Sequence, residues 1–274
     1  MAFLMEEFQC PLKVFDAIDD WEFIPDVKSN LRVRECYEII SKKADVIFTV
    51  SEYLAAKFQP KTSAALIRHL PNGVNLELFS RPADAPRARR NDRKQRRPVF
   101  TYVGVLSNRF DFGIAEAVAR GFPQCTLLLV GPIHNSEKSR FKVLKGLPNV
   151  EWRGLLHHGL IPHILRESDV LLIPHTLSPL ALSMDPLKLY EYLTTGLPIV
   201  ATDVPPMNKY GHLVYVAKDV ESFVEKVSLA LHEQETSEGE SMWRSRIDEA
   251  QNHSWESRVE SIIKDILENM PITY

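Results

Sequence analysis

The chain has 274 residues, enough for one large domain or two small ones. Its 45% hydrophobic and 25% charged residues are ordinary for a globular protein, and the net charge of −3 argues against a protein that binds nucleic acid over its whole surface. Three cysteines without a CxxC spacing give no metal framework and are typical of a reducing compartment. The N-terminus is acidic where a signal peptide is basic, and no apolar run approaches the roughly 18 residues of a membrane span, so we expect a cytoplasmic protein.

Strand-like and helical segments alternate along the chain, a pattern typical of a parallel sheet covered by helices on both faces. In the first part we expect strands at 12–18, 45–50 and 65–69, a helix at 31–43, and a second helix with Ser51 as its N-cap. The sequence Pro71-Asn72-Gly73-Val74 then predicts a turn.

Residues 81–97 interrupt this alternation. They include eight basic residues, two acidic residues and two prolines, with almost nothing apolar, which predicts a mobile connector between two folded parts. One interpretation is peripheral contact with anionic lipid at the inner face of the membrane, and the other is a solvated loop.

The second part resumes the alternation. The pattern predicts strands at 99–103, 126–130, 150–152, 170–173, 199–201 and 213–216, and helices at 113–120, 160–167, 220–231 and 255–270. Ligands of such sheets bind at the carboxyl ends of the strands, so we expect Gly104, Gly131, His175 and the helix that carries Lys188 to line one cleft.

The stretch 185–202, DPLKLYEYLTTGLPIVAT, is the most informative part of the chain. Asp185 is a predicted N-cap and Pro186 a predicted first helical residue. Lys188 would face the positive end of the helix dipole, which a bound phosphate would make favourable, and Glu191 could accept two hydrogen bonds from a ribose diol. The alternative is that Lys188 pairs with Asp185 or Glu191 on a solvated helix.

Four stretches together resemble the GT-B glycosyltransferases of group 1 type: ADVIFTVSEYL at 44–54, LPNGVNLELF at 70–79, FTYVGVLSNRFDF at 100–112, and 168–202. DPLKLYEYL is similar to bacterial exopolysaccharide and teichuronic-type sugar transferases. The resemblance implies an α/β fold with two Rossmann-like domains that face each other across a cleft, the second complete and binding a nucleotide-sugar. The expected domains are a partial N-terminal domain at 1–79, a basic linker at 80–97, a donor domain at 98–252, and a helix at 253–274 that packs back toward the first domain.

The chain departs from this family pattern at several places. The pattern has two glutamates eight positions apart; Glu191 matches the second, and Ser183 stands at the first. Val105 stands where many relatives carry arginine, which leaves Arg109 and Lys188 as the cations for a diphosphate. The first domain is short, with about three strands and an open edge. Two explanations stay open: the start of the chain is cut or misassigned, or a protein partner covers the exposed face.

The resemblance implies transfer of a sugar from a nucleoside diphosphate donor, with UDP favoured, to a saccharide or lipid-linked acceptor. Asp19, after the first strand, is the candidate catalytic base; the alternative is that Asp19 or Asp20 caps the segment after Trp21. There is no DxD motif and no strong metal signature among His157, His158 and His163, so we expect metal-independent chemistry without a cofactor. The residues expected to hold the donor are Gly104, Arg109, Asp111, His175, Pro186, Leu187, Lys188 and Glu191.

Two other functions stay open at this point. With part of the first domain absent, the chain could bind a nucleotide-sugar or a partner transferase without turnover. A sugar-nucleotide epimerase of similar architecture is the third candidate.

Overall fold

The computed structural model describes residues 2–24, 30–59, 62, 64, 66–80, 96–233 and 235–269. Most of the predicted basic linker, residues 81–95, lies outside the described residues. The chain divides into two compact units, each built from segments that are far apart in the sequence. The first unit comprises Met1–Gly73, Ser178–Pro186 and Trp255–Tyr274, and the second comprises Val74–Leu177 and Leu187–Ser254.

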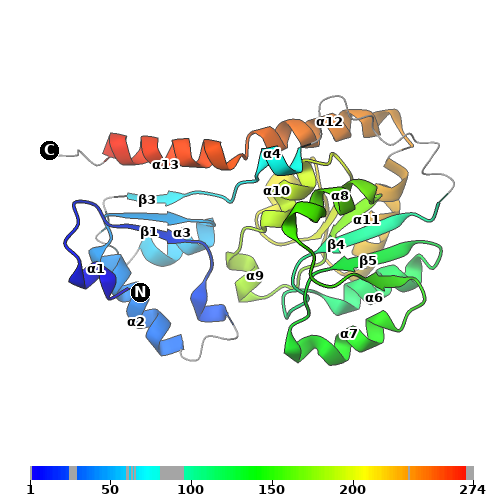
Figure 1. Ribbon diagram of the computed structural model, residues 1–274, viewed down its shortest axis with the longest axis horizontal. Coiled ribbons are helices and arrows are strands. Elements are labelled where there is room, and N and C mark those ends of the chain that lie inside the picture. Colours follow the sequence, from blue (N-terminus) through cyan, green and yellow to red (C-terminus); the bar gives the residue numbers. More distant parts are fainter. Residues whose placement is uncertain are drawn as a thin grey trace. The chain divides into compact units, whose positions relative to one another are not determined.

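The first unit has a three-stranded parallel sheet in the described part of the chain, in the order β1-β2-β3 (Figure 1). The central strand β2 is buried along its whole length, whereas β1 lies at an edge and leaves Val14 39% exposed. Ile47, Leu54 and Phe58 are among the residues of its hydrophobic core. The elements are α1 (Leu4–Glu7), β1 (Val14–Ala17), η1 (Trp21–Phe23), α2 (Asn30–Lys43), β2 (Val46–Thr49), α3 (Glu52–Phe58), β3 (Leu66–His69), α9 (Pro179–Ser183) and α13 (Trp255–Asn269).

Polar contacts join the three segments of this unit. The Arg68 guanidinium on β3 pairs with the Asp265 carboxylate on α13 at 3.1 Å, and Figure 1 shows α13 alongside β3. The Ser51 hydroxyl, at the start of α3, donates to the carbonyl of Ser183 in α9 at 2.7 Å.

The second unit has a six-stranded parallel sheet in the order β6-β5-β4-β7-β8-β9. Numbered within the unit, this order is 3-2-1-4-5-6, the doubly wound arrangement that binds nucleotides where the order reverses. The reversal lies between β4 and β7, which pair through Phe100 with Val170 and Thr101 with Leu171. A ligand site is therefore expected beyond the carboxyl ends of these two strands.

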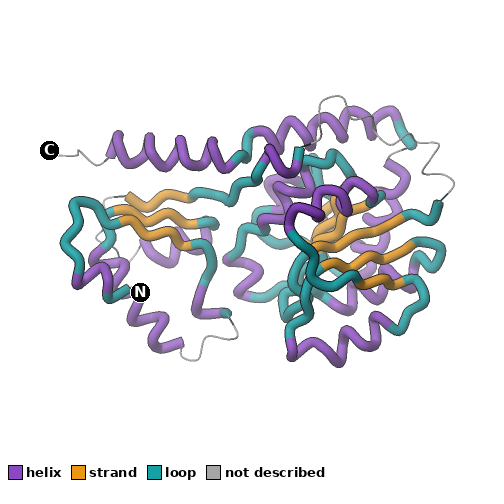
Figure 2. Tube along the Cα trace, viewed as in Figure 1, coloured by secondary structure: helices purple, strands orange, loops and turns teal. Residues whose placement is uncertain are grey.

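Helices cover both faces of the strands in the second unit (Figure 2). On one face, alternate strand residues such as Phe100, Tyr102 and Leu127 pack with residues of α6, α7 and α11. The elements are α4 (Leu76–Phe79), β4 (Val99–Val103), α6 (Phe112–Gly121), β5 (Thr126–Val130), η3 (Asn135–Glu137), α7 (Lys138–Lys145), β6 (Val150–Trp152), η4 (His158–Leu160), α8 (Ile161–Glu167), β7 (Val170–Ile173), α10 (Leu187–Leu193), β8 (Ile199–Thr202), η5 (Met207–Tyr210), β9 (Tyr215–Ala217), α11 (Val220–Glu233) and α12 (Ser237–Gln251).

Several predicted bounds differ from the structure by one or two residues; β1, for example, covers Val14–Ala17 and not 12–18. Two of these differences concern the start of an element. The last strand, β9, begins at Tyr215 and not at 213, because the amides of Leu213 and Val214 both donate to the carbonyl of Tyr210 and close a turn. Helix α10 begins at Leu187, one residue later than expected. Among the described residues, no helix combines the length and the apolar character that crossing a membrane requires.

Candidate functional site

Two glycines follow the strands on one side of the switch point. Gly104 comes after β4 with φ of +151°, and Gly131 comes after β5 with φ of +132°, a backbone region that favours glycine. A methyl group at Gly131 would collide with the carbonyl of Gly104. A methyl group at Gly104 would lie 2.8 Å from the Tyr102 hydroxyl and 3.0 Å from the Lys188 ammonium. Because Gly104 has no side chain, the side chains of Tyr102 and Lys188 can occupy the space beside it.

Lys188 on α10 reaches back to the ends of β4 and β7. Its Nζ lies 3.2 Å from Nε2 of His175, 3.5 Å from the Tyr102 hydroxyl and 4.8 Å from the centre of the Tyr102 ring. The contact with the ring face is a cation–π interaction. The structure therefore brings together Gly104, His175 and Lys188, three of the residues expected from the sequence to hold the donor.

The electrostatics of this cluster disfavour positive charge. Burial, followed by the charge of Arg109, lowers the pKa of Lys188 to about 7. Burial also lowers the pKa of His175 well below its ordinary value, and the charges of Lys188 and Arg109 act in the same direction. The imidazole of His175 is therefore neutral, and an anion beside Lys188 and Arg109 would be stabilised.

His175 leaves one polar atom unused. Among the described residues, its Nδ1 is the one buried side-chain nitrogen or oxygen without a hydrogen-bond partner. A neutral imidazole has one donor and one acceptor nitrogen. When Lys188 donates to Nε2, the proton of His175 is on Nδ1, where the described side chains supply no acceptor.

Glu191 lies one turn after Lys188 on α10. Its side chain is 10% exposed, and its Oε1 lies 3.2 Å from Nε2 of His158 in η4. Burial raises the pKa of Glu191, while His158 and then Lys188 oppose the shift. The sequence also allows Lys188 to pair with Asp185 or Glu191 on a solvated helix, but the contacts of its ammonium are with His175 and Tyr102.

Two other expected donor residues, Arg109 and Asp111, belong to the loop between β4 and α6. Asp111 accepts a hydrogen bond from the Ile114 amide at 3.0 Å and caps α6, and its own amide donates to the carbonyl of Pro174. Arg109 is half-buried, and its charge lowers the pKa of Lys188 and His175. Pro186 is buried and Leu187 is 42% exposed. Direct contact of these residues with a donor stays a prediction.

Asp185 makes contacts that the sequence does not reveal. Its carboxylate accepts a hydrogen bond from the Asn72 amide at 2.6 Å, and its carbonyl accepts one from the Asn72 side chain at 2.6 Å. Asn72 belongs to the turn signal at residues 71–74, so the two motifs meet within the first unit.

Asp19 and Asp20 follow β1 and have different environments. Asp20 is fully buried, binds the Lys57 ammonium at 2.8 Å, and caps η1 by accepting from the Glu22 amide. Asp19 is half-buried, and its carbonyl accepts from the Tyr37 hydroxyl at 3.5 Å. The capping role considered for these residues is therefore filled by Asp20, and the role of Asp19 as a base stays a prediction.

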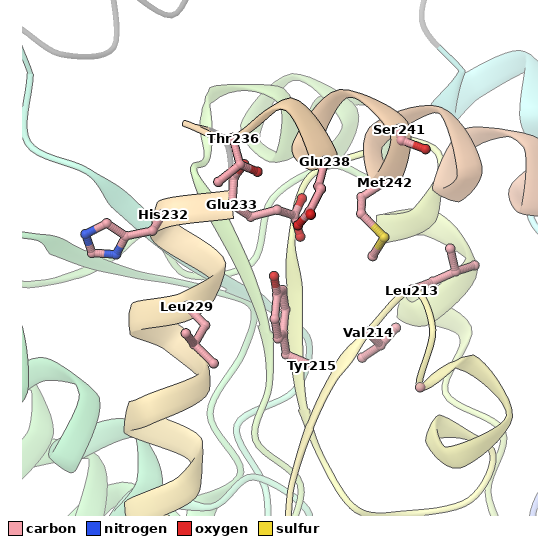
Figure 3. A pocket seen from close by; sticks show the side chains of 11 residues that line it. Leu213, Val214, Tyr215, Leu229, His232, Glu233, Thr236, Glu238, Ser241 and Met242 are labelled. Atoms are coloured by element: carbon pink, nitrogen blue, oxygen red, sulfur yellow. The ribbon is translucent and has the colours of Figure 1, made fainter.

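A separate pocket of about 610 Å³ lies against β9, α11 and α12 (Figure 3). Its wall includes Tyr215, Glu233 and Met242, and none of the predicted site residues lines it. Among the described residues, no group of three or more His, Cys, Asp or Glu side chains is placed to hold a metal ion. Metal independence is still a prediction.

Comparisons with known proteins identify one family. A family model described as Glycosyl transferases group 1 matches residues 97–233, half of the chain. TuaH of Bacillus subtilis (strain 168), which is assigned as a teichuronic acid biosynthesis glycosyltransferase, is 32% identical over 209 residues, or 72% of this chain and 51% of TuaH. The chain thus spans about half the length of this curated relative.

Solved structures show the same architecture. HepE of Anabaena in complex with UDP superposes with a TM-score of 0.71 at 20% identity, covering 93% of this chain and 72% of HepE. A trehalose-phosphate synthase (UDP-forming) of Burkholderia vietnamiensis superposes with a TM-score of 0.72 at 14% identity, covering 97% of this chain and 68% of the synthase. HepE has also been solved with UDP-glucose. These neighbours confirm the expected α/β fold of the GT-B type.

Proposed function

Because the chain belongs to the group 1 glycosyl transferases, we propose that it transfers a sugar from a UDP-sugar to a saccharide or lipid-linked acceptor. The observation that carries this proposal is the Lys188 cluster at the switch point of the second unit. There, the ammonium of a half-buried lysine lies 3.2 Å from a neutral imidazole, and the charge of Arg109 acts on both. A donor diphosphate would add negative charge to this cluster, where the Glu191 carboxylate only partly opposes the lowering of the Lys188 pKa.

The proposed roles follow from position. Lys188 and Arg109 bind the diphosphate and stabilise the charge that develops on the leaving group. Gly104 lets the backbone approach the phosphates, and Glu191 accepts hydrogen bonds from the ribose hydroxyls. Asp19 is our candidate for the base that takes the acceptor proton. The UDP and UDP-glucose complexes of HepE support UDP as the nucleotide of the donor.

Titration calorimetry with UDP and UDP-glucose tests the donor site. We expect UDP to bind the wild-type protein and Glu191→Ala to weaken binding by about 1.5–3 kcal/mol, the range for hydrogen bonds to charged groups. An assay for UDP release with a panel of UDP-sugars and saccharide acceptors then tests transfer. A wild-type protein that binds neither ligand would refute the proposal.

One observation favours a second function, the binding of a nucleotide-sugar without turnover. Ser183 stands at the position of the first family glutamate, and its hydroxyl donates to the carbonyl of Leu180 within α9. It is therefore a poor substitute for a carboxylate that touches the donor sugar. UDP binding without UDP release, in the presence and absence of acceptors, would support this second function.

A further inference from the structure

His158 hydrogen-bonds the Glu191 carboxylate from outside helix α10, and its neighbours form a connected set. The His158 ring packs on the ring of Phe79 in α4, with centroids 5.2 Å apart. The Phe79 carbonyl lies 3.3 Å from the Thr194 hydroxyl, which donates to the Glu191 carbonyl at 2.7 Å. Two chains of contacts therefore lead from Glu191 to Phe79. The Glu191 carboxylate is connected through the His158 ring, and the Glu191 carbonyl through the Thr194 hydroxyl.

Glu191 and His158 differ in their exposure to solvent: the Glu191 side chain is 10% exposed and the His158 side chain is 60% exposed. Within the described part of the chain, His158 makes the side-chain hydrogen bond to this carboxylate. A carboxylate has about four acceptor positions on its two oxygens. One contact to an imidazole thus fixes its orientation and leaves acceptor positions for hydroxyl groups.

We propose that His158 is a positioning residue that orients the Glu191 carboxylate toward the vicinal hydroxyls of the donor ribose. This inference rests on the proposed function, because it takes the ligand of Glu191 to be a ribonucleotide. His158 acts through Glu191 and not through the base or the diphosphate. Its loss should therefore be felt only by ligands that carry the ribose hydroxyls.

The test compares UDP with 2′-deoxy-UDP by calorimetry on four proteins: wild type, His158→Ala, Glu191→Ala and the double variant. We expect the wild type to prefer UDP by about tenfold or more, the size of a hydrogen bond to a charged group. His158→Ala should weaken UDP binding several-fold, weaken 2′-deoxy-UDP binding less because only the 3′-hydroxyl remains to contact Glu191, and so reduce the preference. In the Glu191→Ala background, His158→Ala should have little further effect, since the two residues act on the ligand as one unit.

Two further variants separate positioning from a general effect on folding. His158→Gln keeps a nitrogen donor for Glu191 and should restore most of the preference for UDP. His163→Ala is the matched control, because His163 on α8 forms a similar pair with Glu167 at 3.3 Å, with both side chains mostly exposed. It should leave both affinities unchanged.

The outcomes are distinct. Equal weakening of UDP and 2′-deoxy-UDP by His158→Ala would mean that His158 contacts another part of the ligand or supports the fold, and would overturn the inference. Unchanged affinity for both ligands would also overturn it. If the wild-type protein bound neither ligand, the proposed function would fail first and the inference with it.

Discussion

Lys188 is held where the protein disfavours the charge of its own ammonium group. Burial and the charge of Arg109 lower its pKa to about 7, and the neighbouring His175 is neutral and contributes no compensating negative charge. A bound diphosphate would reverse this balance because it favours the protonated lysine. Binding and protonation should therefore be linked.

We predict that UDP-glucose binds less tightly as the pH rises above 7. Above pH 7 the Lys188 amine of the free protein is mostly neutral, so binding must take up a proton. Affinity should therefore fall by up to about tenfold per pH unit until the pH reaches the pKa of Lys188 in the complex. Calorimetry at pH 6.5, 7.5 and 8.5, in buffers of different ionisation enthalpy, measures both affinity and proton uptake. Lys188→Met should bind weakly and lose the pH dependence. Flat wild-type affinity over this range would contradict direct contact of Lys188 with the phosphates.

Gly104 gives a second prediction at the scale of one residue. Gly104→Ala places a methyl group 2.8 Å from the Tyr102 hydroxyl at a φ of +151°, so we expect the free energy of unfolding to fall by about 1–3 kcal/mol. The methyl group would also displace Lys188 and weaken UDP binding. Urea denaturation and calorimetry check both effects. Gly211→Ala is the control, because its nearest contact is 3.4 Å and its φ is −58°, and it should change neither quantity.

At the scale of elements, one buried guanidinium connects helix α12 to the rest of the second unit. Arg246 has no exposed surface, and its two terminal nitrogens each lie 2.7 Å from an oxygen of Glu233 at the end of α11. The same guanidinium donates to the carbonyls of Leu213 and Gly196. α12 thus depends on a polar network at the point where it packs near β9 and α10.

We predict that Arg246→Met lowers the free energy of unfolding by about 3–5 kcal/mol, because it leaves the Glu233 carboxylate buried without its charged partner. The double variant Arg246→Met, Glu233→Gln should recover part of the loss. Arg244→Met is the control on the same helix: its pair with Glu240 is 69% and 48% exposed, so its loss should stay within about 1 kcal/mol. Urea unfolding measures all three. Equal losses for Arg246→Met and Arg244→Met would refute the argument.

α12 also shows where sequence patterns fail. Its sequence, SEGESMWRSRIDEAQ, has few apolar residues, and it packs through Arg246 and through Trp243, whose indole donates to the carbonyl of Thr195. Apolar periodicity does not detect such polar contacts. It also does not predict α7 (KSRFKVLK), because two buried apolar residues, Phe141 and Leu144, are too few to establish a helical period. In contrast, β4, β5, β6 and β7 have the bounds predicted from their apolar runs.

The candidate site is predictable only in part. The positions of Gly104, His175 and Lys188 follow from the rule that ligands bind at strand ends. The contacts of Tyr102 and His158 do not, because they depend on which side chains meet across segments that are distant in the sequence. Tyr102 alternates with its neighbours like any residue of a buried strand, and His158 carries only a weak metal pattern.

At the scale of the whole molecule, the matched family region, residues 97–233, lies almost entirely in the second unit. We therefore predict that saturating UDP slows amide hydrogen exchange in residues 102–111 and 187–195 and leaves α2 in the first unit unchanged. Exchange reports local opening, which a ligand suppresses where it binds. Protection confined to the first unit would show that the nucleotide binds elsewhere.

The short segment Ser178–Pro186 belongs to the first unit, although the chain on both sides of it belongs to the second. Its Ser183 and Asp185 are bonded to Ser51 and Asn72, respectively. A chimera that exchanges the N-terminal half between relatives at a single crossover near residue 74 would combine one parent's Ser51 and Asn72 with the other parent's α9. An exchange of the first unit between relatives should therefore graft three pieces together: 1–73, 178–186 and 255–274.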